Sequence, residues 1–126
     1  MTVQEIYENM LALTLEKKTD NDDFEDFVVP HFNLLLQELF YHNNVARQRN
    51  GKEPLPVAPR VESREEENPY EWQFDSALVY GLAAKLLTAD EHGLEGTYLQ
   101  MYYAAVNAAL PAQAEKVVDC YAANCD

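Results

Sequence analysis

Two carboxylates at the spacing of one helical turn are the first residues whose types could support catalysis. Glu71 and Asp75 lie four residues apart in a segment with helical character, so their side chains would share one face of a helix. Such a pair could act as general acid and base if a pocket shifted their two pKa values apart. Solvated acids on a helix surface are the commoner explanation. We therefore predict no catalytic residue and no enzymatic activity.

A second group of acids, Asp20 to Asp26, raises the question of a calcium loop. The EF-hand pattern requires glycine at its sixth position and glutamate at its twelfth, where this chain has Glu25 and His31. Acids are also favourable at the first turn of a helix, where backbone N–H groups are unpaired. The run therefore indicates a helix start.

Thiols and imidazoles do not form a metal-binding pattern. Cys120 and Cys125 lie together in the last seven residues, whereas zinc requires four ligands and the nearest histidine is His92. His31 and His42 are isolated, and His31 is expected to be a core residue. The glycines complete no phosphate-binding loop. We predict no metal and no cofactor.

Charge is the strongest compositional feature. Twenty-two acidic against nine basic residues give a net charge of −13, which repels nucleic acid and acidic membranes. Five bases nevertheless fall between residues 47 and 64, where only two acids occur. This basic island indicates either an oriented contact with a partner or an excess of cations near a helix end. Its members are Arg47, Arg49, Lys52, Arg60 and Arg64.

A chain of 126 residues fits one domain with a core of its own. We assign residues 1–110 to a helical domain and 111–126 to a C-terminal tail or arm. No apolar stretch approaches the roughly 20 residues of a membrane span, and the acidic N-terminus is unlike a signal peptide. Synthesis in the cytoplasm and no membrane association are expected.

Hydrophobic periodicity predicts an all-α fold, a small bundle of about four helices. The expected helices cover residues 2–15, 24 or 30 to 50, 70–88 and 94–110. Thr2 and Glu5 have capping-box spacing, and Gly51 suits the position after a helix end. The helix over 70–88, which includes Trp72, should be central, and Gly81 within it implies close packing. The longer form of the second helix, kinked at Pro30, would share one apolar face: Phe24, Phe27, Val28, His31, Leu34, Leu35 and Leu39.

Four prolines between residues 52 and 69 rule out a helix there. We expect a long Pro-rich loop or a short β-ribbon between the second and third helices, and long loops in compact domains are often functional.

Tyrosine is abundant, and it is enriched at protein interfaces. The last two helices carry more apolar surface than a monomeric four-helix packing can bury, which points to self-assembly. Besides the basic island, the candidate partner-binding residues are Tyr98, Tyr102, Val117, Val118 and Tyr121.

The segments Asn68–Tyr70, Ala77–Leu87 and Tyr98–Tyr102 resemble those of the small head–tail connector proteins of tailed phages and prophages. Similarity extends over most of residues 1–110. The resemblance implies a non-enzymatic virion protein that forms a ring, commonly of twelve, between the portal protein and the tail-completion or stopper protein. Packaged DNA would pass through this neck without sequence-specific binding. It also implies that the 51–69 loop and the 111–126 tail reach neighbouring subunits or the portal.

An acidic regulator of a basic protein, either a DNA mimic or an antitoxin-like inhibitor, is the alternative function. The net charge of −13 suits it equally well. The acids, however, bunch at expected helix starts and turns rather than forming an array along one surface.

Overall fold

The computed structural model describes residues 1–14, 22–87 and 94–111, and this part of the chain is all-α, as predicted. In these described ranges, five α-helices and one short 3-10 helix follow one another, and an isolated bridge joins Thr2 to Glu67. The elements are α1 (Val3–Leu13), α2 (Asp22–Glu38), α3 (Phe40–Arg49), η2 (Trp72–Phe74), α4 (Asp75–Leu86) and α5 (Leu94–Ala109).

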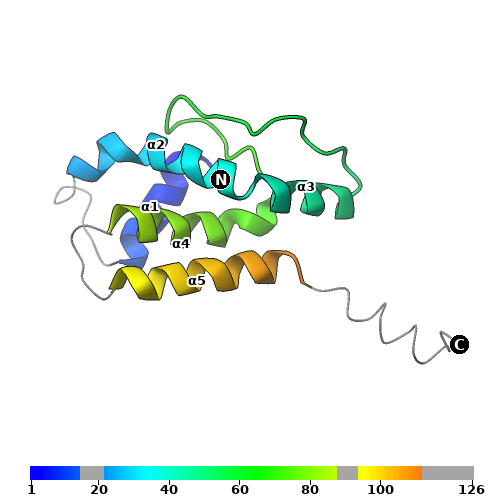
Figure 1. Ribbon diagram of the computed structural model, residues 1–126. Helices are drawn as coiled ribbons and strands as arrows, with labels where there is room; N and C mark the ends of the chain where they lie inside the picture. The colour runs from blue at the N-terminus through cyan, green and yellow to red at the C-terminus, as the bar shows by residue number, and fades with distance from the viewer. Residues whose placement is uncertain (15–21, 88–93, 112–126) are drawn as a thin grey trace, which may run out of the picture.

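Helix α4 lies at the centre of the bundle. Helices α1, α2 and α5 pack around it, and α5 runs alongside it for most of its length (Figure 1). Its residues Ala77, Leu78, Leu82 and Ala83 are fully buried. The expectation of a central third helix is therefore correct, and α4 is the element against which α1, α2 and α5 pack.

Gly81 of α4 lies where α2 and α5 come closest to it. A Cβ atom at this position would lie 2.6 Å from Leu35 Cδ2 and 2.9 Å from two ring carbons of Tyr102. These separations are too short for carbon atoms in contact, which lie about 3.5–4 Å apart. The packing reason expected for Gly81 is thus the close approach of Leu35 from α2 and Tyr102 from α5.

The N-terminus of α1 has the predicted capping box. Glu5 N donates to the Thr2 hydroxyl at 3.1 Å, and Thr2 N donates to the Glu5 carboxylate at 3.0 Å. Val3 and Gln4 donate their backbone N–H groups to carbonyls of Glu66 and Arg64. The first turn of α1 is thus tied to the end of the long loop, because these donors have no partner inside the helix.

The second predicted helix is in fact two helices. Helix α2 continues through Pro30, as in the longer interpretation, but it ends at Glu38, and α3 begins after Leu39. The predicted face is also partly wrong, since Phe27 and Leu34 are exposed. The buried residues recur at ordinary helical spacing, and Phe27 and Leu34 lie on the other side of the helix. The buried side of α2 is Val28, Phe32, Leu35 and Leu36, with Leu39 at the break.

The third predicted helix begins later than expected. Residues 72–74 form the 3-10 helix η2, and α4 starts at Asp75. Trp72 was expected within the apolar helix but is 75% exposed. The interior position of this segment is taken by Tyr70, whose hydroxyl donates to the Leu36 carbonyl, and by Phe74.

Residues 51–71 connect α3 to η2 without forming a strand, so the β-ribbon alternative is wrong for this segment. Gly51 has a φ of 81°, the left-handed conformation that ends α3 as predicted. The loop does not project as an arm. It lies along α2 and α3 (Figure 1), and Val61 is 2% exposed.

Candidate interaction surfaces

Helices α2 and α5 each bring apolar residues to the surface. Phe27 and Leu34 of α2 are 52% and 46% exposed, and Leu99 and Tyr103 of α5 are 41% and 57% exposed. These four are half of the eight large apolar side chains that are exposed in the described residues. We call them the α2–α5 face.

Polar contacts of Glu38 join α2 to α4 and α5. Glu38 accepts hydrogen bonds from Lys85 Nζ at 2.6 Å and from the Tyr102 hydroxyl at 3.0 Å. Leu34 lies one turn before Glu38 on the same side of α2, because residues four apart share a helix face. The same relation places Phe27 one turn before His31, whose ring it contacts. Glu38 thus ties α2 to α4 and α5.

A groove of about 400 Å³ lies between α2, α3 and α5. Tyr103 lies on its rim, and its ring packs 5.5 Å from that of Tyr102. Burial, followed by the negative charge of Glu38, raises the pKa of Tyr102 above its usual range, so this phenol stays protonated and donates. The lining residues are Glu38, Leu39, His42, Tyr102, Tyr103, Val106 and Asn107.

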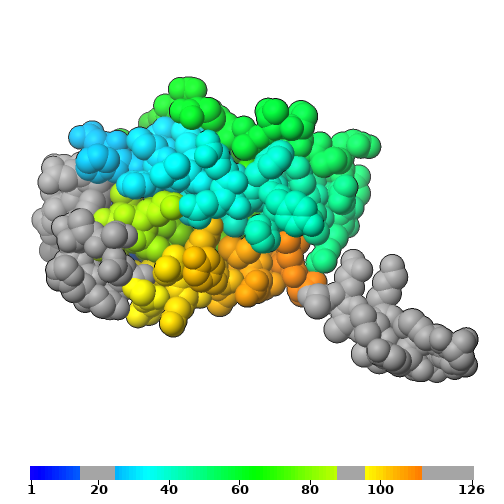
Figure 2. Space-filling view, viewed as in Figure 1, coloured from blue at the N-terminus to red at the C-terminus, as the bar shows by residue number. Residues whose placement is uncertain are grey.

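Helix α5 differs from the rest of the chain in charge. Residues 96–111 contain no acidic and no basic side chain, although the whole chain carries −13. Gln100, Ala104 and Ala108 are exposed on this helix in addition to the two apolar residues of the face. Figure 2 shows α2 (cyan) and α5 (yellow to orange) at the surface on either side of α4. An exposed stretch of helix without charged residues, in a strongly acidic protein, is suited to contact with another protein.

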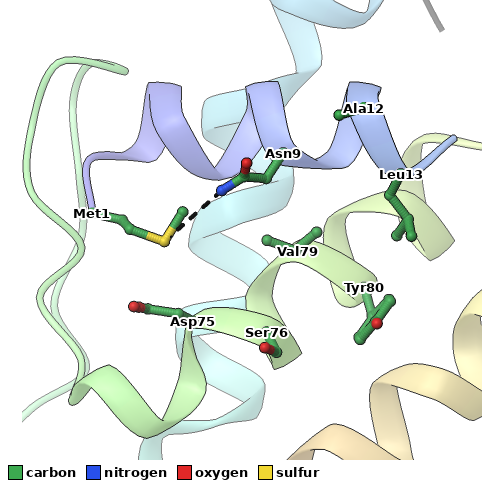
Figure 3. Close-up of a pocket in the computed structure, with 8 residues that line it drawn as sticks. All are labelled: Met1, Asn9, Ala12, Leu13, Asp75, Ser76, Val79 and Tyr80. Atoms are coloured by element: carbon green, nitrogen blue, oxygen red, sulfur yellow. Dashed lines mark hydrogen bonds between the residues drawn. The ribbon is translucent and has the colours of Figure 1, made fainter. Parts of the chain in front are cut away.

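A second groove, of about 420 Å³, lies between α1 and α4 (Figure 3). Ala12 and Leu13 of α1 face Val79 and Tyr80 of α4 across its apolar end. Its polar end contains Asn9, Ser76 and Asp75, and Met1 closes that end. Among the described residues that line it, Asp75 is the only one with a charged side chain, and Met1 carries the N-terminal ammonium, which pairs with Glu67.

Two residues of the predicted basic island stabilise the fold. Lys52 Nζ lies 2.9 Å from the Glu71 carboxylate, and Arg47 lies 3.7 Å from it. Asn50 donates to the same carboxylate at 2.9 Å. Burial alone would raise the pKa of Glu71, but the bonds from Asn50 and Lys52 and the charges of Lys52 and Arg47 outweigh it and hold the pKa below 4.5. This cluster fastens the end of α3 to the start of η2.

The other three bases of the island are dispersed. Arg49 donates to the carbonyl of Pro111 at 2.8 Å and so joins the ends of α3 and α5. Arg64 lies 3.6 Å from Glu25 of α2. Arg60 is exposed at a smaller groove of about 320 Å³ beside α2. The island is therefore not one patch, and Arg60 is its member best placed to meet a partner.

Of the predicted aromatic contacts, Tyr102 is buried and Tyr98 is half-buried against the core. Val117, Val118 and Tyr121 lie outside the described residues, as do Cys120 and Cys125. The sequence prediction missed Leu99 and Tyr103 as partner-binding candidates, although they share one side of α5. Four-residue spacing combined with the absence of charge over 96–111 was the signal that could have identified them.

The paired carboxylates separate in the structure. Glu71 is 6% exposed, not a solvated surface acid, whereas Asp75 accepts a hydrogen bond from Asn68 at 3.2 Å. His31 is half-buried, and burial followed by the charge of Lys85 lowers its pKa from 6.5, which keeps the imidazole neutral. Over residues 1–14, 22–87 and 94–111, no three His, Cys, Asp or Glu side chains gather as metal ligands.

In the same described ranges, no helix is both long and apolar enough to cross a membrane. No protein-family model matches the chain, and comparisons with curated proteins and with solved structures find no match either. The fold and its surfaces define a small all-α bundle with an exposed neutral, apolar face.

Proposed function

We propose that this chain is a non-enzymatic assembly protein of the virion, a head–tail connector that forms a ring at the neck between the portal protein and the stopper or tail-completion protein. The α2–α5 face is the observation that carries the proposal. A protein with a net charge of −13 repels its own copies, so association requires contact surfaces free of charge. Residues 96–111 supply such a surface.

The acidic remainder of the chain suits the same role. Packaged DNA must slide through the neck of a virion, and acidic walls repel its phosphates rather than bind them. Exposed Arg60 and the apolar residues Phe27 and Leu34 offer anchors for the portal or stopper protein, because buried apolar and arginine contacts dominate interface energies.

The test is the native mass of the chain, measured by light scattering alone and with the portal protein encoded beside it. A complex with a fixed subunit ratio that matches the portal ring is the expected result. The Tyr103→Glu variant should lose self-association, whereas Gln48→Glu, the same change in charge at an exposed position of α3, should not. No complex with the portal, together with a salt-sensitive complex with a basic protein, would favour the acidic regulator instead.

A further inference from the structure

The α1–α4 groove opens on a different side of α4 from the side that packs against α2 and α5. Val79 lines the groove, whereas Gly81 faces Leu35 of α2 and Tyr102 of α5. Residues two positions apart in an α-helix, such as these, differ in direction by about 200°. Each copy therefore presents two different surfaces.

The two surfaces are complementary in chemistry. On the α2–α5 face, Leu99 and Tyr103 form a neutral ridge one helical turn long. The α1–α4 groove has an apolar end at Val79 and Tyr80 and a carboxylate, Asp75, at its polar end. A phenol is a hydrogen-bond donor and a carboxylate is an acceptor, so the ridge supplies both the apolar area and the donor that the groove accommodates.

Charge allows a second copy to occupy the groove. Helix α1 carries Glu5 and Glu8 and no basic residue, so an acidic segment would be repelled there. The ridge lies within residues 96–111, which bring no charge at all. We infer that the Leu99–Tyr103 ridge of one copy docks in the α1–α4 groove of the next, an inference that rests on the proposed function.

Head-to-tail docking of this kind has a direct consequence for assembly. A contact between two different surfaces leaves an open assembly with a free ridge at one end and a free groove at the other, so copies add, and a ring forms where the rotation between neighbours closes. A contact of the α2–α5 face with itself would instead stop at two copies. The docking thus explains how a small acidic bundle can form a ring.

The experiment uses the full chain with one surface blocked at a time. Tyr103→Glu blocks the ridge, and Ser76→Glu blocks the groove at an exposed position of α4. Ala12→Glu, exposed on α1, is a second groove variant in case the first disturbs α4. Gln48→Glu is the control for added charge. Sedimentation velocity of each variant, and of Tyr103→Glu mixed with Ser76→Glu, gives the number of copies in each species.

Each blocked variant should be monomeric, with self-association at least about tenfold weaker than in the wild type, which corresponds to roughly 1.4 kcal/mol. The mixture should form a complex of two copies and nothing larger, since one variant retains its groove and the other its ridge. Wild-type assembly by both Ser76→Glu and Ala12→Glu would overturn the inference and leave the proposed function standing. A wild type that stays monomeric at every concentration also contradicts the inference, and the complex with the portal then decides the proposed function separately.

Discussion

The side-chain amide of Asn33 makes both hydrogen bonds to the backbone of Val61. Val61 N donates to Asn33 Oδ1 at 2.8 Å, and Asn33 Nδ2 donates to the Val61 carbonyl at 3.0 Å. Asn44 repeats this arrangement with Leu55, at 2.7 Å and 3.1 Å. The loop therefore runs antiparallel to α2 and α3, and two asparagines replace the strand partner that it lacks.

Replacement of Asn33 by alanine should destabilise the protein by about 2–3 kcal/mol, because it leaves the buried N–H and C=O of Val61 unpaired. Asn44→Ala should cost less, about 1 kcal/mol, since this contact is only partly buried. Urea denaturation gives both values. Amide hydrogen exchange should accelerate at Val61 in the first variant and at Leu55 in the second. Unchanged exchange at Val61 in Asn33→Ala would show that the loop is held by other contacts.

Gly81→Ala should destabilise the protein although alanine favours helix. The helical gain of about 1 kcal/mol opposes an overpacking cost of about 1–3 kcal/mol against Leu35 and Tyr102. Gly96→Ala is the matched control, because a Cβ atom there meets nothing within 4 Å. It should stabilise the protein by about 0.5 kcal/mol. Thermal unfolding compares the two variants, and a higher midpoint for Gly81→Ala would mean that α4 is not tightly enclosed.

Glu71→Gln should cost about 1–3 kcal/mol at neutral pH, because it leaves Arg47 and Lys52 without their carboxylate. The exposed Glu53→Gln, which removes the same charge nearby, should change stability by less than about 0.5 kcal/mol.

The pH dependence of this difference follows from the pKa of Glu71. The folded pKa lies below the ordinary 4.5, so the unfolded chain binds the proton more readily. The stabilising contribution is therefore complete above pH 4.5 and is lost as the pH falls through the folded pKa. Denaturation of wild type and Glu71→Gln across this range should show the two stabilities converging in acid, and a constant gap would contradict the assignment.

Sequence periodicity predicted the helices of this fold well but their boundaries less well. Thr2, Gly51 and Gly81 have strong local preferences, so a capping box, a helix end and a close approach could be read from them. The break at Leu39 has no such marker. Phe27 and Leu34 were misplaced because an apolar pattern does not distinguish a core side from an interaction side of the same helix.

Contacts between distant residues were beyond sequence reasoning. Arg47 and Lys52 were candidates either for a partner contact or for a cation excess at a helix end, but Glu71 lies 24 and 19 residues further along the chain and reaches them only after the loop folds back. The hydrogen bonds that Asn33 and Asn44 make to the loop could not be predicted for the same reason. An asparagine in a helix is also usually expected to face solvent. Leu99 and Tyr103 could have been identified from the absence of charged residues over 96–111.

The role of the α2–α5 face as an assembly surface is tested most directly by sedimentation velocity of the wild type and Tyr103→Glu over a range of concentrations. Tyr103 is 57% exposed, so the variant should fold with an unchanged melting temperature. We predict that the wild type forms larger species as concentration rises and that Tyr103→Glu remains a monomer. A folded Tyr103→Glu that assembles like the wild type would contradict the central claim.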